Sequence, residues 1–507
     1  MKTRLILLFS FVFSISNSQD IVVKINENNA NQTISKHIYG HFAEHLGRCV
    51  YGGIYVGDDS KIPNTDGVRN DIINALKELN IPNLRWPGGC FADVYHWKDA
   101  LGPKKDRKHI ENVSWGNVRE NNGFGTHEFL NLCEALGAEP YLAVNMNSGS
   151  VQEAMEWEQY VNNENGASSL TDLRAKNGRE KPWNVKYWGI GNESWDCGGH
   201  MTADYYVNLY KRYATAMTSY DNTEKLYRIA VGPGTPDYEW TETVMKNIPA
   251  KRIEGLSVHH YSVFDWVDKG SSVEFSNEEY YKTMKRAWFM EEFITKNDEV
   301  MSKYDPEKKV GLIVDEWGGW YNVLPGTNKQ FLHQQNTMRD AMIAGLTLNI
   351  FNNHADRVHM ANLAQTVNVL QAVILTDEEK MLLTPTYHVM NMYKVHQDAT
   401  LLPSKIENNI TLDGVPALSV SASKNRNGKK HISLTNIDIN KSFEVEISLD
   451  KIKNASAKIL TSAKAQDHNT FNSTDNVKPE TFKDFKIKNN TLSVKVPPLS
   501  VIVFYED

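Results

Sequence analysis

Residues 183–195 read WNVKYWGIGNESW, an apolar and aromatic run that breaks at two glycines and then presents Asn192 and Glu193 in succession. A short run of this kind is typical of a fully buried strand. A carboxyl group at the C-terminal end of a buried strand, beside an amide that can donate hydrogen bonds, suits acid chemistry on a polar substrate. Taken alone, Asn-Glu-Ser would fit a solvated loop equally well, so the interpretation depends on the rest of the chain.

A second stretch repeats this arrangement. Residues 310–317, VGLIVDEW, again run from apolar residues into a carboxylate, Glu316, which a tryptophan follows. From about residue 39 to residue 393, short apolar runs alternate with stretches whose apolar residues recur at helical spacing. The runs that we interpret as further buried strands are 84–86, 140–144, 228–231, 256–260 and 312–314.

This alternation predicts the fold of most of the chain. Repeated strand–helix units imply a parallel sheet of the α/β class, and eight such units close into a (β/α)8 TIM barrel. The competing architecture is a doubly wound open sheet, which usually carries a glycine-rich phosphate-binding loop after its first strand. The sequence has no such loop. We therefore predict a (β/α)8 TIM barrel over residues 38–396.

The pattern changes after the predicted barrel. Residues 397–507 consist of short alternating segments separated by Asn, Asp, Gly and Lys turns, which predicts a C-terminal antiparallel β-sandwich domain. Residues 19–37 contain two segments of similar composition, at 21–25 and 33–34. We expect these N-terminal strands to pair with the sandwich.

Residues 1–18 have the pattern of a secretory signal peptide. Lys2 and Arg4 precede an apolar run at 5–15, and small residues follow up to Ser18. The run is too short to cross a bilayer, which needs roughly 20 apolar residues, and no later segment is long and apolar enough to act as a membrane anchor. We expect export to the periplasm or the medium.

The bulk composition narrows the range of partners. The chain of 507 residues carries a formal net charge of -7 and has no concentration of basic residues, which argues against a nucleic-acid partner. Its four cysteines are too sparse for a disulfide scaffold. Cys49, Cys90 and Cys197 lie near glycines in predicted loops, where one pair is able to approach, and the sequence leaves the pairing open.

Within a barrel, polar residues at the ends of the strands share one face of the molecule. Glu193 and Glu316 are about three strand–helix units apart, which places them on strands four and seven, across the barrel mouth. We expect their carboxyl groups to lie ~5–5.5 Å apart, the spacing of a retaining glycosidase. Aromatic residues near these strand ends suit the C–H faces of sugar rings; they are Trp86, Trp97, Trp195, Trp317 and Trp320.

The two carboxyl groups divide the work by electrostatics. A carboxylate close to another carboxylate resists ionisation, so one member of the pair stays protonated and acts as an acid. We assign Glu193 as the acid/base, because Asn192 before it offers an amide for the sugar 2-hydroxyl. We assign Glu316 as the nucleophile, oriented by Tyr261.

Five motifs make the chain resemble glycoside hydrolase family 51, the α-L-arabinofuranosidases. They are YGHFAEHLGR (39–48), LRWPGGCFADVYHW (84–97), GNE (191–193), HHY (259–261) and DEWGGWY (315–321). The similarity covers most of the predicted barrel, and a flanking sandwich is also found in that family. It implies a retaining double displacement and assembly into homo-oligomers, often hexamers. Our leading hypothesis is an exo-acting enzyme that removes terminal α-L-arabinofuranosyl residues from arabinan, arabinoxylan or derived oligosaccharides, and we expect no cofactor or metal.

The resemblance also implies a set of residues around the sugar. The contacting residues would be Glu44, Arg85, Asn192, Tyr261 and Gln365, with Trp195 and Trp320 as walls. Cys90 departs from the pattern, since many relatives carry Asn after the paired glycines. Because a thiol is a poorer hydrogen-bond partner than an amide, we expect a weaker contact between Cys90 and the sugar.

Several other functions fit parts of the sequence. A related barrel glycosidase, such as an endo-glucanase or xylanase, would have an open groove in place of a pocket, and a non-catalytic carbohydrate-binding protein would bind sugar without turnover. Residues 41–45 spell the metallopeptidase pattern H-x-x-E-H, but that pattern needs a helix, and Gly40 and Gly47 bracket a predicted strand and loop. Cys90 near His96 would suit a thiol hydrolase, for which no base and orienting partner are identifiable.

Overall fold

Eight parallel strands close into a barrel in the computed structural model, which describes residues 21–220 and 225–507. In barrel order of the chain they are β2 (Gly40–Phe42), β5 (Asn83–Trp86), β8 (Glu139–Val144), β9 (Tyr187–Ile190), β10 (Tyr227–Ala230), β11 (Gly255–Ser262), β12 (Gly311–Gly319) and β13 (Val358–Ala364). The barrel closes where β13 pairs with β2. The predicted (β/α)8 TIM barrel is confirmed.

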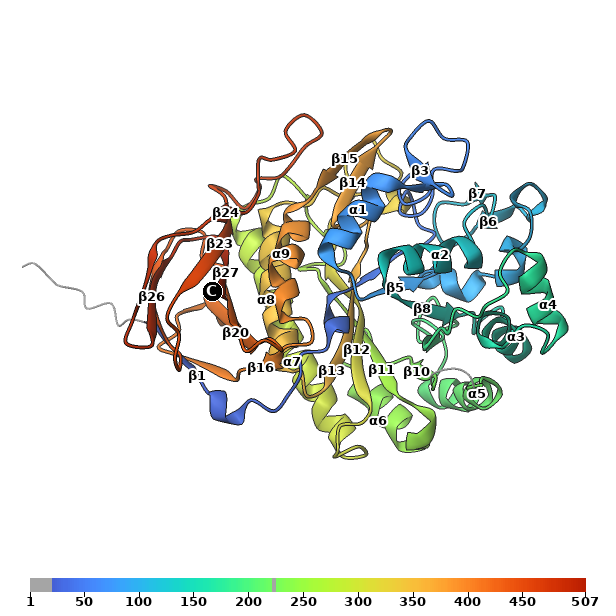
Figure 1. Ribbon diagram of the computed structural model, residues 1–507, viewed down its shortest axis with the longest axis horizontal. Coiled ribbons are helices and arrows are strands. Elements are labelled where there is room, and N and C mark those ends of the chain that lie inside the picture. The colour runs from blue at the N-terminus through green and yellow to red at the C-terminus, as the bar shows by residue number, and fades with distance from the viewer. Residues whose placement is uncertain (1–20, 221–224) are drawn as a thin grey trace, which may run out of the picture.

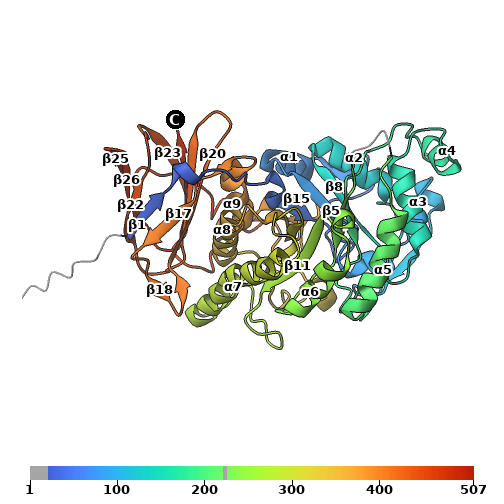
Figure 2. The same cartoon turned by 90° about the horizontal axis from the view of Figure 1, so that it is seen from below.

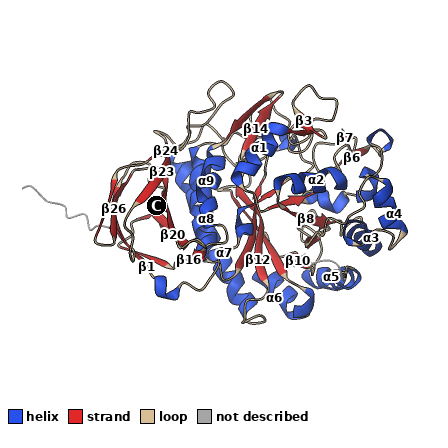
Figure 3. Cartoon of the chain, in the orientation of Figure 1, coloured by secondary structure: helices blue, strands red, loops and turns tan. Residues whose placement is uncertain are grey.

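Helices follow the strands and surround the barrel, as Figure 3 shows. They are α1 (Asn70–Leu79), α2 (Thr126–Leu136), α3 (Val151–Asn162), α4 (Ser169–Lys176), α5 (Ala203–Ala216), α6 (Tyr238–Asn247), α7 (Asn277–Ser302), α8 (Met338–Asn353) and α9 (Pro385–Tyr393). Helix α1 illustrates the pattern: Ile72, Leu76 and Leu79 face the core at helical spacing, and Asn80 ends the helix in the left-handed conformation.

The C-terminal strands form two packed sheets beside the barrel (Figure 1). One sheet contains β17 (Ser404–Glu407), β1 (Ile21–Ile25), β22 (Phe443–Ser448), β26 (Thr491–Val496) and β25 (Phe485–Lys488). The other contains β16 (Thr400–Leu401), β20 (Leu418–Lys424), β21 (Lys430–Asn436), β27 (Ser500–Glu506), β23 (Ala455–Thr461) and β24 (Glu480–Thr481). The predicted C-terminal sandwich is confirmed.

One strand pair of the sandwich is parallel. Strand β1 runs antiparallel to β17 but parallel to β22. Neighbouring strands joined by tight turns must be antiparallel, whereas β1 comes from the far end of the chain and no turn fixes its direction.

Helix α8 joins the two domains. It is buried along nearly its whole length because it lies between the barrel and the sheet that contains β20 and β21 (Figure 2). Asn349 on α8 donates to the Ser419 hydroxyl at 2.9 Å and accepts from the Ser433 hydroxyl at 2.7 Å. A buried amide that is hydrogen-bonded on both sides fixes the register of helix on sheet.

Short two-stranded ribbons decorate the barrel loops. They are β3 (Asn64–Thr65) with β4 (Val68–Arg69), β6 (Ile110–Asn112) with β7 (Val118–Glu120), β14 (Ile374–Asp377) with β15 (Lys380–Leu383), and β18 (Thr411–Leu412) with β19 (Val415–Pro416). The β6–β7 ribbon belongs to a long excursion between β5 and α2 that returns to the barrel mouth. Over the described residues, no helix combines the length and apolarity needed to traverse a bilayer.

Candidate active site

The two glutamates singled out in the sequence meet at the C-terminal ends of the fourth and seventh barrel strands. Glu193 follows β9, and Glu316 lies within β12. One carboxylate oxygen of each, together with a ring nitrogen of His259, lie within 4.8 Å of one another. The predicted side-chain juxtaposition is therefore present in the structure.

A bulge in β12 shapes this meeting point. The three steps from Ile313 to Glu316 in β12 face only two steps in β11, from Ser257 to His259. On the other side, the three steps from Val314 to Trp317 face two steps in β13. Successive residues of a regular strand point to opposite faces, whereas an extra residue re-aims the side chains around it. Asp315 and Glu316, though adjacent, therefore both contact Arg85 inside the barrel.

Glu193 sits on a tight turn. Gly191 has φ 89° and Glu193 itself has φ 39°, a left-handed conformation that is uncommon outside glycine. Its Oε1 lies 2.8 Å from Nδ1 of His259, and its Oε2 lies 3.5 Å from Sγ of Cys197. Burial and the nearby charge of Glu316 raise the pKa of Glu193, while the contact with His259 opposes this rise.

Two hydrogen-bond donors hold the carboxylate of Glu316. Arg85 donates from Nη1 to Oε1 at 2.8 Å, and Tyr261 donates its hydroxyl to Oε2 at 2.7 Å. Gly89 gives the carboxylate room, because a Cβ at that position would lie 2.7 Å from Oε1 of Glu316. These contacts fix the orientation of Glu316 and stabilise its negative charge.

His259 links the carboxylates. Besides Glu193, its Nε2 lies 3.1 Å from Oδ1 of Asp315, and its Nδ1 lies 3.6 Å from Oε2 of Glu316. Burial alone would lower the pKa of His259, but the charges of Glu316 and Asp315 raise it to about 10. The imidazolium of His259 therefore stays charged at neutral pH. Burial would raise the pKa of Asp315, but the charges of Arg85 and His259 outweigh this and hold the pKa of Asp315 low. The sequence places His259 at a strand end on this face, but no role was predicted for it there, and Asp315 was not predicted at the site.

Asn192 is fixed from both its side chain and its backbone. Arg85 donates from Nη2 to Oδ1 of Asn192 at 2.5 Å. The buried carboxylate of Asp93 accepts the Asn192 backbone N–H at 3.1 Å and those of Met146 and Asn147 at 2.7 and 3.1 Å. Asp93 thus ties the loops after β8 and β9 together beneath the site.

Glu44 closes the inner end of the site. It accepts the backbone N–H of Gly89 at 2.9 Å, the indole N–H of Trp115 at 2.9 Å and the side-chain amide of Gln365 at 2.6 Å. Burial and the charge of Glu316 raise the pKa of Glu44 to about 7. Trp115 comes from the β6–β7 excursion, and its place here was not predicted from the sequence.

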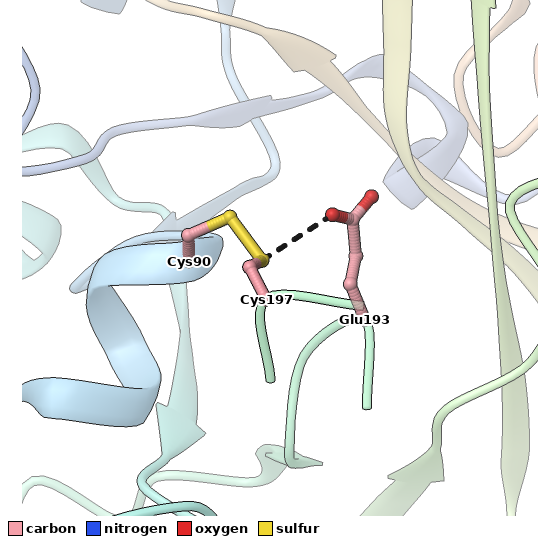
Figure 4. A group of neighbouring side chains, drawn as sticks. All are labelled: Cys90, Glu193 and Cys197. Atoms are coloured by element: carbon pink, nitrogen blue, oxygen red, sulfur yellow. Dashed lines mark hydrogen bonds between the residues drawn. A yellow bond between two sulfur atoms is a disulfide. The ribbon is translucent and has the colours of Figure 1, made fainter. Parts of the chain in front are cut away.

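Cys90 is not a free thiol. It forms a disulfide with Cys197, which lies on the same loop as Glu193 (Figure 4). The expectation of a weakly bonding thiol was therefore wrong, because spatial proximity of the loops after β5 and β9 decides the pairing. A disulfide sulfur carries no proton, so the contact between Cys197 and Glu193 is a hydrogen bond only when the carboxyl group is protonated and donates.

Two cavities with shared walls lie at this point. The narrow one, about 40 Å³, is lined by Glu44, Glu316 and Gln365 among others. The wider one, about 420 Å³, is lined by Trp195 and Trp266. Both share the walls Cys90, Trp115, Glu193, Tyr261 and Trp320.

Three tryptophans expected in the cleft are in the core. Trp86, Trp97 and Trp317 are at most 1 % exposed, and Trp317 packs edge-on against Phe351 of α8. Trp86 and Trp317 each follow an inward-facing residue of a strand, Arg85 or Glu316, so they point out of the barrel. Trp195 and Trp320 do line the cavities, as expected.

The carboxylates offer no ready metal site. Glu193, His259 and Glu316 are close enough to share an ion, but His259 faces carboxylates with both ring nitrogens and is charged, so it has no lone pair to donate. The H-x-x-E-H motif does not form a helix either: His41 lies in β2, fully buried, and Glu44 lies in the loop that follows.

Comparisons with known proteins agree with this architecture. The family model described as "Alpha-L-arabinofuranosidase 1 domain" matches residues 75–274, and the one described as "Alpha-L-arabinofuranosidase C-terminal domain" matches residues 315–500. A protein from Bacteroides ovatus named "Intracellular exo-alpha-L-arabinofuranosidase" is 47% identical over 99% of both chains. The crystal structure of the GH51 arabinofuranosidase from Xanthomonas axonopodis pv. citri is 43% identical, with a TM-score of 0.94 over 96% of this chain and 100% of that one.

These relatives overturn the prediction of export. The Bacteroides ovatus protein is named intracellular, as is an "exo-alpha-(1->5)-L-arabinofuranosidase" from Acetivibrio thermocellus that is 33% identical over 67% of this chain and 69% of its own. The predicted signal peptide, residues 1–18, lies outside the described residues. A short apolar run behind two basic residues is a compositional pattern, and here it was the wrong basis for predicting localisation.

The family assignment rests on agreement between these independent lines. The barrel and sandwich, the paired glutamates and the full-length similarity all point the same way. The alternatives of a different barrel glycosidase or a non-catalytic binding protein have no such support. The chain belongs to glycoside hydrolase family 51, the α-L-arabinofuranosidases.

Proposed function

We propose that the protein is an exo-acting α-L-arabinofuranosidase that works by retaining double displacement, with Glu316 as nucleophile and Glu193 as acid/base. One observation carries the proposal: carboxylate oxygens of the two residues lie within 4.8 Å of each other in one cavity. Retaining enzymes need carboxyl groups ~5–5.5 Å apart, whereas inverting enzymes leave ~6.5–9.5 Å for a water molecule.

Glu193 is suited to the acid role. Burial and the charge of Glu316 raise its pKa, which favours the protonated form that an acid catalyst needs. Because Oε1 accepts from the charged His259 ring, the proton belongs on Oε2, which faces the cavity side near Cys197. From there it can be transferred to the oxygen of the departing group.

Glu316 is suited to attack. As one of its oxygens bonds to the anomeric carbon, the bond from that carbon to the leaving oxygen breaks, and Glu193 protonates the leaving oxygen. In the second step a water molecule gives a proton to Glu193, and its oxygen displaces Glu316 from the anomeric carbon. Two inversions restore the original configuration.

The shape of the site supports exo action. Glu44 and Gln365 close the narrow cavity, where we place the arabinofuranosyl ring, with Arg85, Cys90 and Asn192 beside it. Hydrogen-bonding groups around a closed pocket favour a chain end over a polymer interior. Trp195 and Trp320 then act as walls, and Tyr261 orients the nucleophile.

The same proposal extends to substrate and assembly. We expect terminal arabinofuranosyl groups of arabinan, arabinoxylan and their oligosaccharides as substrates. The names of the relatives support the exo action on α-L-arabinofuranosides and, for one of them, on (1->5) linkages. We also expect a homo-oligomer, as the family resemblance implies. Light scattering of the purified protein tests the assembly, and product analysis on branched arabinan and arabinoxylan fragments tests the substrates.

The direct test is release of arabinose from 4-nitrophenyl α-L-arabinofuranoside. Glu316→Gln should lower kcat by at least about 10⁴-fold, because the nucleophile is lost while the site keeps its shape. Glu299→Gln, on the surface of α7, is the matched control and should retain native turnover. Absence of turnover by the native protein, or normal turnover by Glu316→Gln, would refute the proposal.

A further inference from the structure

In the proposed reaction, the wider of the two cavities is the one that would receive the leaving group. Glu316 lines only the narrow cavity, whereas Glu193 lines both. If the sugar ring sits over Glu316, the bond protonated by Glu193 points into the wider space. At about 420 Å³ this space, here called the aglycone cavity, is within the usual size of a small-molecule site.

Helix α7 builds the far wall of the aglycone cavity. Arg286, Phe289 and Phe293 line it from one helix face, together with His260 of β11. The His260 ring is fixed by a 2.8 Å contact between Nε2 and the Arg286 carbonyl oxygen, and it packs on Phe289 at 5.4 Å between ring centroids. His260 directly follows His259, so this wall is part of the same strand end that positions the acid.

The Arg286 guanidinium has no partner among the described residues. No hydrogen bond or ion pair reaches it, and its Nε is buried without an acceptor. Within the described part of the chain the guanidinium lies over the face of Phe289, 5.1 Å from the ring centroid, a contact that does not use its N–H groups. By contrast, the buried Arg228 and Arg357 each pair with a carboxylate at 2.8 Å.

An unpaired half-buried guanidinium is costly and therefore informative. Buried polar groups are nearly always hydrogen-bonded, and exceptions call for a ligand, an ion or water. Burial lowers the pKa of Arg286, and among the residues that the structure describes no acidic neighbour offsets this. An arginine fork matches the geometry of a carboxylate, to which it can donate two parallel hydrogen bonds.

The remaining walls fit a flat ring that carries such a group. Trp195, Trp266 and Trp320 line the cavity, and Trp266 is 56 % exposed at its mouth. Lys269 lies over the rings of Trp266 and Trp320 at 5.7 and 5.9 Å, which adds a second positive charge near the entrance. Two acidic residues also line the cavity. Glu193 is the proposed acid and its pKa is raised, while Asp196 is largely exposed and lies 3.7 Å from His200.

We propose that the aglycone cavity selects arabinofuranosides whose leaving group is a ring bearing a carboxylate, with Arg286 as the anion-binding residue. The inference rests on the proposed function, since it concerns the leaving-group side of the same reaction. A uronic acid and an aromatic acid present the same chemistry to Arg286. The experiment separates these two sources.

The test compares 4-carboxyphenyl with 4-carbamoylphenyl α-L-arabinofuranoside, which match in shape and differ in charge. For each protein the ratio of kcat/KM on the acid to kcat/KM on the amide is measured. Dividing the ratio of a variant by that of the native enzyme removes the difference in leaving-group reactivity. Arg286→Gln should lower the ratio about tenfold, the lower end for a hydrogen bond to a charged group.

Two further variants control this result. Arg286→Lys keeps the charge but loses the fork, so it should retain a ratio between those of the native enzyme and Arg286→Gln. Lys282→Gln removes an exposed charge one turn earlier on α7, outside the cavity lining, and should leave the ratio at its native value. An unchanged ratio in Arg286→Gln would mean that water alone satisfies the guanidinium, and the proposal would be overturned.

Inhibition of the native enzyme provides a measurement that needs no variant. D-Glucuronate is compared with D-glucose, and 4-hydroxybenzoate with 4-hydroxybenzamide, as competitive inhibitors. If D-glucuronate inhibits more strongly than D-glucose, the source of the carboxylate is a uronic acid. If 4-hydroxybenzoate inhibits more strongly than 4-hydroxybenzamide, the source is an aromatic acid. If neither acid inhibits better than its neutral partner, the inference fails. Turnover of the amide glycoside in that case leaves the proposed function standing, whereas no turnover of either glycoside counts against the function itself.

Discussion

Loss of the Cys90–Cys197 bridge should weaken both the stability of the barrel and the acid role of Glu193. The bridge joins the loops after β5 and β9 and places a sulfur 3.5 Å from Oε2 of Glu193. The double variant Cys90→Ser, Cys197→Ser removes it without leaving a stray thiol. In the native protein a reductant breaks the same bridge. It breaks no other disulfide, because the other two cysteines, Cys49 and Cys133, are already free and buried.

The expected size of the effect follows from the length of chain that the bridge closes. The two cysteines are 107 residues apart. The chain-entropy relation gives about 4.8 kcal/mol at 25 °C for a loop of that length, and measured values usually fall at about 2–4 kcal/mol. We therefore expect the free energy of unfolding to fall by about 2–4 kcal/mol.

The effect on chemistry has a definite sign. Serine hydroxyls in place of the sulfurs can donate hydrogen bonds to the Glu193 carboxylate, which favours its ionised form and lowers its pKa. Glu193 must be protonated to act as an acid. The alkaline limb of the pH dependence of kcat/KM should therefore lie at lower pH in the variant than in the native protein.

Urea unfolding followed by tryptophan fluorescence, and the pH dependence of kcat/KM, measure the two effects. The native oxidised protein, the native protein with reductant and the double variant are compared under the same conditions. Equal unfolding midpoints for all three would show that the bridge does not constrain the unfolded chain. An alkaline limb that moves to higher pH in the variant would contradict the assigned relation between the bridge and Glu193.

Three more substitutions probe the site. Glu193→Ala should slow hydrolysis of an arabino-oligosaccharide by about 10²–10⁴-fold but hydrolysis of a 2,4-dinitrophenyl glycoside far less; equal losses on both would argue against the acid role. His259→Gln removes the cation that holds the pKa of Glu193 down, so the alkaline limb of kcat/KM should move to higher pH; an unmoved limb would contradict the role of His259. Gly89→Ala places a Cβ 2.7 Å from Oε1 of Glu316 and should lower kcat about 100-fold; native kcat in a folded variant would show that the contact is harmless.

The parts of the fold that could be predicted are those that depend on local pattern. Apolar runs that alternate with amphipathic stretches predict a parallel barrel, and the carboxyl ends of its strands must share one face. That rule alone is enough to bring Glu193 and Glu316 together from distant parts of the chain. The direction of β1 against β22 was not predictable, because no turn or crossover connects the two strands.

The residues missed at the site depend on tertiary detail. Asp315 reaches the site only because β12 has a bulge. No residue type in VGLIVDEW predicts that bulge. Trp115 arrives from an excursion with no periodic pattern of its own. The burial of Trp317, however, could have been predicted: strand neighbours alternate between faces, so a tryptophan beside an inward-facing Glu316 points outward.

The central claim is tested most directly by the anomeric configuration of the first-formed arabinose. It is followed by ¹H NMR during rapid hydrolysis of an aryl α-L-arabinofuranoside. In parallel, the Glu193→Ala variant is quenched during turnover and its peptides are analysed by mass spectrometry. The two glutamates, with oxygens within 4.8 Å, predict α-arabinose as the first product and an arabinofuranosyl ester on the peptide that contains Glu316. β-Arabinose as the first product, or an ester on any other residue, would contradict the mechanism.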